Sequence, residues 1–378
     1  MRVIEADLLD RRDLEKFIQV PEQFYRGNPY YVQPLIREQR RFFHPNNPHF
    51  AYTDARYYLL QDKNGRVRGR ISAHTDRRHL EREQEKVGYF GFFECPPDQE
   101  AANALLEIAE QDLVARGMSA IQGPYNFSIN EQCGFLAQGF DQAPALMMPY
   151  TQPAYPALVG SAGYQCFRRL FAYEFDHVGL NAERIERIRE RVTKRKGVSI
   201  RSVDPKKFES EVVSLYSLYC HVWEEALGYV PMTEEIFRQH AEELRVVADP
   251  NLVLLAEKEG SPIAFSFTLP DHNAIIKKMR GRIWPFGWIW LLAHRYLVRR
   301  ARTVMLGVKS EYRAIGLDTL LIFETLKRCV ARGYRSGEAS WIQEENLAMR
   351  RPIERAGGRV SKIYQLYEKQ LRTTINPC

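Results

Sequence analysis

Residues 304–333 read VMLGVKSEYRAIGLDTLLIFETLKRCVARG, and this stretch decides the fold. It begins within a short apolar run, 301–308, which is typical of a buried strand. Apolar side chains then recur on or near one helical face: Leu320, Leu321, Phe323, Leu326 and Val330. This spacing predicts a helix over Asp318–Ala331, and Gly333 stands where a glycine commonly ends a helix. The stretch therefore predicts strand, loop and helix, in that order.

The residues on both sides extend this alternation of strands and helices. After the helix, 336–342 predict a strand, Asn346–Ala356 a short helix ended by two glycines, and 359–371 a final strand. Before it, 252–258 and 262–270 predict an antiparallel pair joined by a short turn.

The same order of elements occurs earlier in the chain. Val-Ala-Arg-Gly stands at 114–117 and again at 330–333, an offset of 216 residues (330 minus 114). Further matches follow in order, the last at an offset of 194: Gly91 with Gly307, Asn130 with Asn346, and Ala162 with Ala356. The difference between the offsets, 216 minus 194, predicts an insertion of 22 residues in the first half.

The first half accordingly repeats the elements of the second. Its predicted segments are the hairpin 55–62 and 66–74 around Asn64-Gly65, strand 86–94, helix Asp98–Ala115, strand 119–125, helix Tyr155–Ala162 and strand 166–175. At 378 residues the chain also exceeds the size at which one hydrophobic core stops growing. We expect an α/β (α+β) protein of two similar domains, 1–180 and 198–371, joined by a charged connector, 181–197. Each would hold a mixed central sheet flanked by helices.

Composition narrows the function classes. No apolar run approaches the roughly 18 residues of a membrane span, and the charged N-terminus is unlike a secretion signal. The six cysteines show no metal-binding or disulfide spacing, so we expect a cytoplasmic protein with reduced thiols and no metal. A net charge of +7 favours polyanionic partners, such as phosphorylated cofactors or anionic lipids. No nucleic-acid-binding motif occurs, so we expect no nucleic acid partner.

The element order, together with the loop before the long helix, resembles the GNAT acyltransferase family. In that family a loop of pattern (Q/R)xxGx(G/A) binds the pyrophosphate of acyl-CoA, and here Arg313-Ala314-Ile315-Gly316-Leu317-Asp318 occupies its place. Backbone N–H groups at a helix N-terminus attract anions, and glycine permits close approach. Asp318 replaces the last small residue and either caps the helix or crowds a phosphate. The resemblance implies acetyl-CoA or long-chain acyl-CoA as co-substrate, with an oxyanion-binding N–H near Gly307–Val308 at a strand bulge.

A second family signature is an asparagine that opens the following helix and contacts the pantetheine arm. Asn346 fits that place, whereas the family's frequent tyrosine acid is replaced by Ile353. In the first half, Pro97 and Glu100 stand where the loop has Arg313 and Gly316. Because proline lacks an N–H and glutamate repels phosphate, we expect only the second half to bind acyl-CoA.

The insertion in the first half lies within Asn126–Pro156. One interpretation is an ordered surface loop that packs on its own domain. The other is a wall of the acceptor site, because long irregular loops are often functional. On the second interpretation Asn126, Asn130 and Glu131 would contact the acceptor, the last two from a cleft between the domains.

A basic and aromatic segment, 277–302, precedes the strand of the second half. It holds three of the five tryptophans, two of which, Trp284 and Trp288, we single out as acceptor contacts. Tryptophan and arginine beside a short apolar run favour an interfacial helix on an anionic membrane, here the inner leaflet. A buried helix with basic ends in solvent, or a protein interface, would fit the same pattern.

This segment and the motif GPYNFSINEQCGFLAQGFD resemble a group of bacterial tandem GNAT proteins that includes bacterial ceramide synthase. The resemblance implies direct transfer of an acyl group to a sphingoid-type amine. Glu311 or Glu338 is the candidate base, and Tyr312 or Tyr364 the candidate proton donor to the thiolate. Alternatives are an acetyltransferase for small amines or proteins, a peptidyltransferase that uses aminoacyl-tRNA, and a non-catalytic binding protein.

Overall fold

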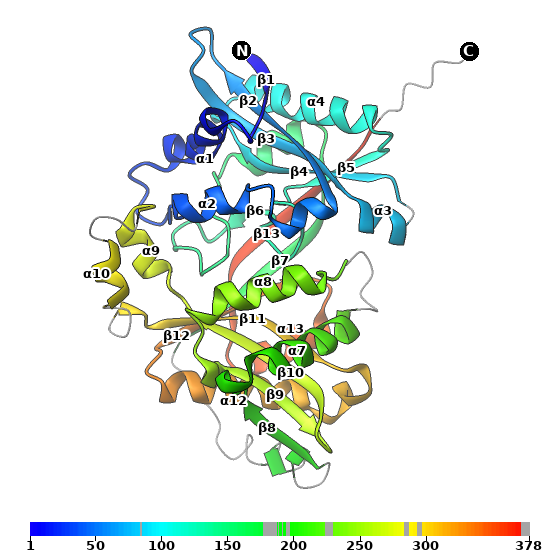
Figure 1. Ribbon diagram of the computed structural model, residues 1–378, viewed down its shortest axis with the longest axis vertical. Helices are drawn as coiled ribbons and strands as arrows, with labels where there is room; N and C mark the ends of the chain where they lie inside the picture. The colour runs from blue at the N-terminus through cyan, green and yellow to red at the C-terminus, as the bar shows by residue number, and fades with distance from the viewer. Residues whose placement is uncertain are drawn as a thin grey trace. The chain divides into compact units, whose positions relative to one another are not determined.

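The structure is a computed structural model that describes residues 1–83, 85–176, 187, 189–190, 192–193, 197–223, 230–282, 287–292 and 297–371. The chain forms two compact units (Figure 1). The first unit contains Met1–Arg169, Ile276–Leu291 and Lys362–Cys378. The second unit contains Leu170–Ile275 and Leu292–Ser361.

The first unit is built on a mixed sheet. Its elements are β1 (Arg2–Ala6), α1 (Arg11–Tyr25), α2 (Ile36–Phe42), the 3-10 turn η1 (Pro48–Ala51), β2 (Thr53–Gln61), β3 (Val67–Asp76), α3 (Arg77–Glu83), β4 (Val87–Glu94), α4 (Gln99–Ala115), β5 (Ala120–Gly123), β6 (Phe135–Gln138) and α5 (Tyr155–Ser161). Neighbouring strands follow the order β1-β2-β3-β4-β5, and the C-terminal part of β13 (Arg359–Gln370) continues it beside β5, while β6 also pairs with β13. The β4–β5 pair is parallel and the others are antiparallel.

Alternating side chains cover the two faces of this sheet differently. Tyr58 and Leu60 of β2 pack in one core with α4 and α5. Tyr57 and Leu59, one residue out of step, pack in another core with α1 and η1. Because strand side chains point alternately to opposite faces, α4 and α1 lie on opposite sides of the sheet, as Figure 1 shows. The first unit is therefore a three-layer structure.

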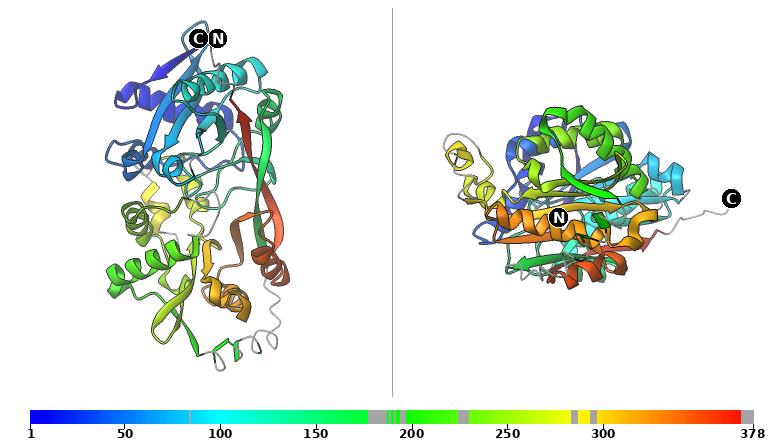
Figure 2. Two further views of the ribbon diagram at one scale, coloured as in Figure 1. Left: turned by 90° about the vertical axis from the view of Figure 1, so that its right-hand side faces the viewer. Right: turned by 90° about the horizontal axis from the view of Figure 1, so that it is seen from below.

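The second unit repeats this plan. Its elements are β7 (Gln165–Asp176), β8 (Val198–Ser202), η2 (Pro205–Lys207), α7 (Phe208–Trp223), α8 (Glu234–Arg245), η3 (Pro250–Leu252), β9 (Val253–Lys258), β10 (Ser261–Pro270), β11 (Arg300–Val308), η4 (Ser310–Ile315), α12 (Leu317–Ala331), β12 (Ser336–Gln343) and α13 (Leu347–Arg355). The helix α9 (Asn273–Met279) begins in this unit and passes into the first unit after Ile275. The strand order is β7-β12-β11-β10-β9-β8, with a parallel β11–β12 pair. Leu254 and Ala256 pack with α12, whereas Leu255 packs with α7 and α8 on the other face (Figure 2).

The last strand of each sequence half pairs in the unit of the other half. β7 ends the first half of the sequence, yet Leu170–Asp176 pair with β12 in the second unit. β13 ends the second half, yet Tyr367–Gln370 pair with β5 in the first unit. The compact units therefore differ from the sequence ranges 1–180 and 198–371, because the closing strands are exchanged. The predicted connector, 181–197, lies mostly outside the described residues.

The structure confirms the predicted fold class, two α/β halves with mixed sheets flanked by helices. Predicted and observed elements agree to within a few residues, for example Asp318–Ala331 against α12 and Asp98–Ala115 against α4. Among the helices that the structure describes, none combines the length and apolar character needed to cross a membrane.

Candidate functional site

In the second unit, the parallel strands β11 and β12 are paired along only part of their length. Registered pairing of β11 with β12 covers only Arg300–Thr303 against Ser336–Ala339, although β11 continues to Val308 and β12 to Gln343. We call the region beyond Thr303 and Ala339 the fork. Here an edge of β11 is not paired with β12, and such an edge can bind an extended ligand through its backbone.

The backbone groups on this edge can be identified from one hydrogen bond. The N–H of Lys309, just after β11, donates to the carbonyl of Ile263 in β10 at 3.0 Å. Successive residues of a strand direct their N–H and C=O groups to opposite edges. Leu306 and Val308 therefore direct theirs toward the fork. The guanidinium of Arg313 donates from Nε to the carbonyl of Val308 at 3.2 Å, which ties the following loop to this edge.

The loop after β11 leads into a helix whose N-terminus has no side-chain cap among the described residues. Gly316 is the N-cap residue of α12, with a left-handed φ of 83°. The helix begins at Leu317, so Asp318 lies in its first turn and does not cap it. Burial raises the pKa of Asp318. The Asp318 carboxylate interacts with its own N–H and with that of Thr319, whereas the N-cap residue Gly316 has no side chain to satisfy the first N–H groups. Since such groups attract anions, a phosphate here would meet the N–H groups of Gly316 and Leu317.

Two other residues of the predicted acyl-CoA loop pack in the hydrophobic core of the second unit. Leu317 is buried in the core and Ile315 packs against it. The side chain of Ala314 is outside the described part of the chain.

The corresponding helix of the first unit is capped. The carboxylate of Asp98 accepts hydrogen bonds from the N–H groups of Glu100 and Ala101 at the start of α4. Glu100 adds a second acidic group to the same turn. The start of α4 therefore has a side-chain cap that the N-cap of α12 lacks, and its two acidic groups, against one in α12, repel phosphate more strongly.

Gly307 has a packing role that the sequence did not reveal. A β-carbon at Gly307 would lie 2.8 Å from the Phe265 ring, 3.0 Å from Val222 and 3.1 Å from Trp223. Glycine therefore lets the end of α7 pack on β11. The predicted bulge at Gly307–Val308 is wrong, because the register between β10 and β11 shifts across Val304, three residues upstream.

Glu338, a candidate base, is buried in a charged network. Its two carboxylate oxygens accept from Arg300 Nη2 and from the Ser340 hydroxyl, both at 2.8 Å. Arg300 also donates to Glu174, and Arg302 Nε donates to Ser340 at 3.0 Å. A carboxylate held by an arginine is stabilised as the anion, so this geometry argues for an anchoring role.

Glu311, the other candidate base, is exposed. Its carboxylate lies 3.9 Å from Nε2 of His221, at the end of α7. The pKa of Glu311 is lowered, first by its own backbone N–H. Tyr312, the candidate proton donor beside it, is half-buried and has Lys258 Nζ 5.9 Å from its ring centroid. Both residues follow β11 directly, and their roles stay predictions.

Tyr364 was predicted to act with the acyl-CoA loop of the second half. It lies instead in the first unit, fully buried, and pairs with Leu136 of β6. The exchange of β13 explains this position, because the strand leaves the second unit after Ser361. Its role as proton donor stays a prediction.

Asn346 is the N-cap of α13, as its place in the sequence predicted. Its side-chain oxygen accepts from the N–H of Met349 at 3.1 Å. The oxygen is therefore used within the helix, and the amide Nδ2 is the group that remains to meet a ligand.

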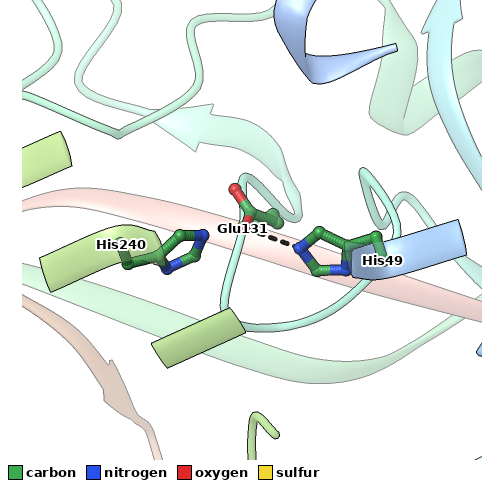
Figure 3. Close-up of side chains that lie close together, drawn as sticks. All are labelled: His49, Glu131 and His240. Atoms are coloured by element: carbon green, nitrogen blue, oxygen red, sulfur yellow. Dashed lines mark hydrogen bonds and ion pairs between the residues drawn. The ribbon is translucent and has the colours of Figure 1, made fainter. Parts of the chain in front are cut away.

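A carboxylate of the insertion in the first unit pairs with a buried histidine of η1. His49 of η1 is 3% exposed, and its Nε2 lies 3.0 Å from Oε1 of Glu131, as Figure 3 shows. His240, also drawn there, belongs to α8 of the second unit. Asn130 donates its N–H to the hydroxyl of Ser128 at 3.2 Å. The pair holds the insertion to η1, and no sequence signal marked His49.

Asn126, at the start of the insertion, is bonded within its own unit. Its side-chain oxygen accepts from the N–H of Phe92 at 2.8 Å.

The basic and aromatic segment contributes α9 and α10 (Gly287–Leu292). Although it interrupts the second half of the sequence, Ile276–Leu291 belong to the first unit, where the N–H of Ile36 donates to the carbonyl of Gly281 at 3.0 Å. The segment is therefore not a helix buried in the second domain, which was one interpretation of its sequence. Lys278 Nζ lies 4.7 Å from the ring centroid of Trp290. Trp284 and the side chain of Trp288 lie outside the described residues.

Two curated relatives match nearly the whole chain. Protein YghO of Escherichia coli strain K12 is 33% identical over 370 residues, which cover 96% of this chain and 94% of that protein. Bacterial ceramide synthase of Caulobacter vibrioides is 33% identical over 371 residues, 95% of each chain. No protein-family model matches the chain.

Solved structures share the fold at low sequence identity. A tandem GNAT protein from the clavulanic acid biosynthesis pathway aligns with a TM-score of 0.58 at 12% identity, over 98% of both chains. A GCN5-related N-acetyltransferase from Sphaerobacter thermophilus aligns with a TM-score of 0.56 at 14% identity, over 99% of this chain and 98% of that one. The chain has the fold of these tandem GNAT proteins. Because a relative at 33% identity covers nearly the whole sequence, the chain belongs to the family that includes bacterial ceramide synthase.

Proposed function

We propose that the protein is an acyl-CoA-dependent N-acyltransferase whose second unit binds the acyl-CoA. The observation that carries this proposal is the combination of the fork with the uncapped N-terminus of α12. The two features follow one another along the chain, with Arg313 between them. An acyl-CoA has matching chemistry, an amide-bearing arm followed by a pyrophosphate.

The backbone of β11 would bind the arm. Amide groups of an extended ligand pair with the N–H and C=O groups of a strand edge, here those of Leu306 and Val308. The N–H groups around Gly316 and Leu317 would then meet the pyrophosphate, since the described residues supply no side-chain cap. The pairing to β11 also holds the thioester in a fixed place, which lowers the entropic cost of reaction.

The reaction is amide formation. The amine nitrogen forms a bond to the thioester carbonyl carbon, the carbon–sulfur bond breaks, and the thiolate gains a proton while the nitrogen loses one. Of the candidate bases, Glu311 is exposed and accessible, whereas Glu338 is buried and paired. Glu311 is therefore the better candidate to accept a proton.

We further propose that the acceptor is a sphingoid-type amine. This rests on the 33% identity to bacterial ceramide synthase over 95% of the chain. A long-chain amine and a long-chain acyl-CoA would then be joined as a lipid amide. The basic character of the chain, +7 overall, would favour contact with an anionic membrane that holds such lipids.

The test is a product assay by mass spectrometry. The purified chain is incubated with acetyl-CoA or a long-chain acyl-CoA, and with a sphingoid amine or a short water-soluble amine. The proposal expects an N-acylated sphingoid product together with equimolar free CoA. Acylation of the short amine only would contradict the lipid acceptor, and no CoA-dependent product with any amine would contradict the activity.

A further inference from the structure

The first unit contains a strand edge equivalent to the fork, and its own chain covers it. Pairing of β4 with β5 covers only Val87–Tyr89 against Ala120–Gln122, although β4 continues to Glu94. The offset of 216 residues that aligns the halves places Phe90 on Leu306 and Phe92 on Val308. The first unit therefore has the same two backbone positions that would hold an acyl-CoA arm in the second.

Both positions are bonded to the segment that follows β5. The N–H of Tyr125 donates to the carbonyl of Phe90 at 2.8 Å. The N–H of Phe92 donates to the side-chain oxygen of Asn126, also at 2.8 Å. A side-chain carboxamide has the same acceptor as the amide of a pantetheine arm. Asn126 therefore occupies, from within the chain, the place of a ligand amide.

The contact between the two segments leaves no space for another ligand. A β-carbon at Gly91 would lie 1.9 Å from the carbonyl oxygen of Tyr125, so only glycine permits this approach. A β-carbon at Gly123 would lie 2.5 Å from the carbonyl oxygen of Phe90. The chain is thus packed against β4 at backbone distance.

The insertion starts at Asn126, and the same contacts hold its first loop. The N–H of Asn126 donates to the carbonyl of Gln132 at 2.9 Å, and Tyr125 forms a bridge with Cys133. Phe127 adopts a φ of 80°, which is rare for a residue with a side chain. Its ring stacks on that of Phe42 with centroids 5.2 Å apart. The loop is held in a strained conformation by its surroundings, as functional loops often are.

We propose that Asn126 is a positioning residue, which holds the insertion 127–156 for selection of the amine acceptor. It does so by filling, in the first unit, the backbone site that acyl-CoA fills in the second. The inference rests on the proposed function and reassigns Asn126 from acceptor contact to anchor of the loop. Replacing Asn126 would then impair selection of the amine acceptor and leave acyl-CoA binding unchanged.

The test compares Asn126→Leu, which has no acceptor oxygen, with Asn126→Asp, which keeps one. Hydrogen exchange reports the Phe92 amide directly, and steady-state assays report KM for each substrate. We expect Asn126→Leu to lose protection at Phe92 by at least tenfold and to raise KM for the amine several-fold, with KM for acyl-CoA unchanged. Asn126→Asp should restore both values toward those of the unchanged protein.

Each outcome decides the inference separately from the proposed function. Unchanged protection at Phe92 in Asn126→Leu would overturn the anchor. Lost protection with equal effects on both KM values, or on kcat only, would overturn the role in acceptor selection. Absence of turnover in the unchanged protein would contradict the proposed function and with it acceptor selection, while the exchange data would still test the anchor.

Discussion

Arg300 donates from Nη2 to the carboxylate of Glu338 at 2.8 Å, within the paired part of β11 and β12. Both side chains are largely withdrawn from solvent, with side-chain exposures of 22% and 0%. Taking charges out of water is costly unless they are paired, so each depends on the other. The pair therefore joins the two strands within their paired part, and the fork opens beyond it, after Thr303 and Ala339.

Removing this carboxylate should destabilise the second unit. Because Glu338→Ala removes one of the carboxylates that pair with Arg300, while Glu174 and Asp271 remain, we expect a loss of about 1.5–3 kcal/mol in the free energy of unfolding. Glu338→Gln keeps an acceptor oxygen and should lose less. Urea unfolding monitored by circular dichroism measures both. If Glu338→Gln folds normally but loses all activity, Glu338 is the base and the anchoring role is wrong.

Gly307 should tolerate no side chain. Gly307→Ala would press a methyl group against the Phe265 ring and the end of α7, which we expect to cost about 1–3 kcal/mol of stability. Gly337→Ala is the matched control on the neighbouring strand, since its nearest contact would be 3.4 Å away. Thermal unfolding of the two variants provides the comparison. Equal midpoints would show that α7 does not pack on Gly307 as described.

Stability should depend on pH through Glu94 in the first unit. Its buried carboxylate accepts from the hydroxyls of Tyr25 at 3.0 Å and Tyr155 at 2.7 Å, and burial raises its pKa from 4.5 to about 7. The folded state therefore binds a proton between these values that the unfolded state has released. The stability contributed by Glu94 is present below pH 4.5 and is lost as the pH rises toward 7.

Glu94→Gln isolates this effect. The unfolding free energy of the unchanged protein minus that of the variant should fall from pH 4.5 to pH 7, by at most about 1.4 kcal/mol per pH unit. The comparison with the variant is needed because burial lowers the pKa of His74 from 6.5 to about 3, which favours stability in the opposite direction. A difference that stays constant with pH would rule out a perturbed Glu94.

The exchanged strands predict that the sequence halves do not fold separately. Residues 1–180 lack Lys362–Leu371, so β5 would lose the partner that pairs from Tyr367 to Gln370. We expect this fragment to show no cooperative unfolding transition, and to gain one when residues 181–378 are co-expressed. A fragment 1–180 that unfolds cooperatively and shows native exchange protection at Ile121 would contradict the exchange.

Membrane contact stays a prediction of the sequence. We expect the protein to sediment with anionic vesicles through the segment that contains Trp284, Trp288 and Trp290, because tryptophan and basic side chains favour the lipid interface. Replacing all three with alanine should abolish co-sedimentation, and neutral vesicles serve as the control. Binding that survives the triple replacement would remove the segment as the contact.

The sequence predicted the helices, strands and loops whose positions depend on residues close together in the chain. Apolar spacing over Leu320–Val330 and the glycine at 333 located α12 to within one residue of its start. The internal repeat located the loop of the second half and its loss in the first. The apolar spacing and the glycine are local signals, and the same element order in both halves supports each assignment.

What the sequence did not predict depends on contacts between distant residues. Nothing near Tyr364 indicates that its strand pairs with β5 and β6, because both candidate sheets would accept the same alternating pattern. Nor does the sequence indicate that Asn126 bonds to Phe92 and Glu131 to His49. Polar residues in a loop have the same sequence pattern whether their partner is a ligand or the protein itself.

The central claim is that acyl-CoA binds to the second unit and not the first. Isothermal titration of CoA into the unchanged protein, Gly316→Glu and Gly333→Glu tests it most directly. Gly333 has a φ of 86°, close to the 83° of Gly316, but lies at the other end of α12, so it controls for strain and charge. We predict one site per chain, lost in Gly316→Glu and retained in Gly333→Glu. Two sites per chain, or unchanged affinity in Gly316→Glu, would contradict the account.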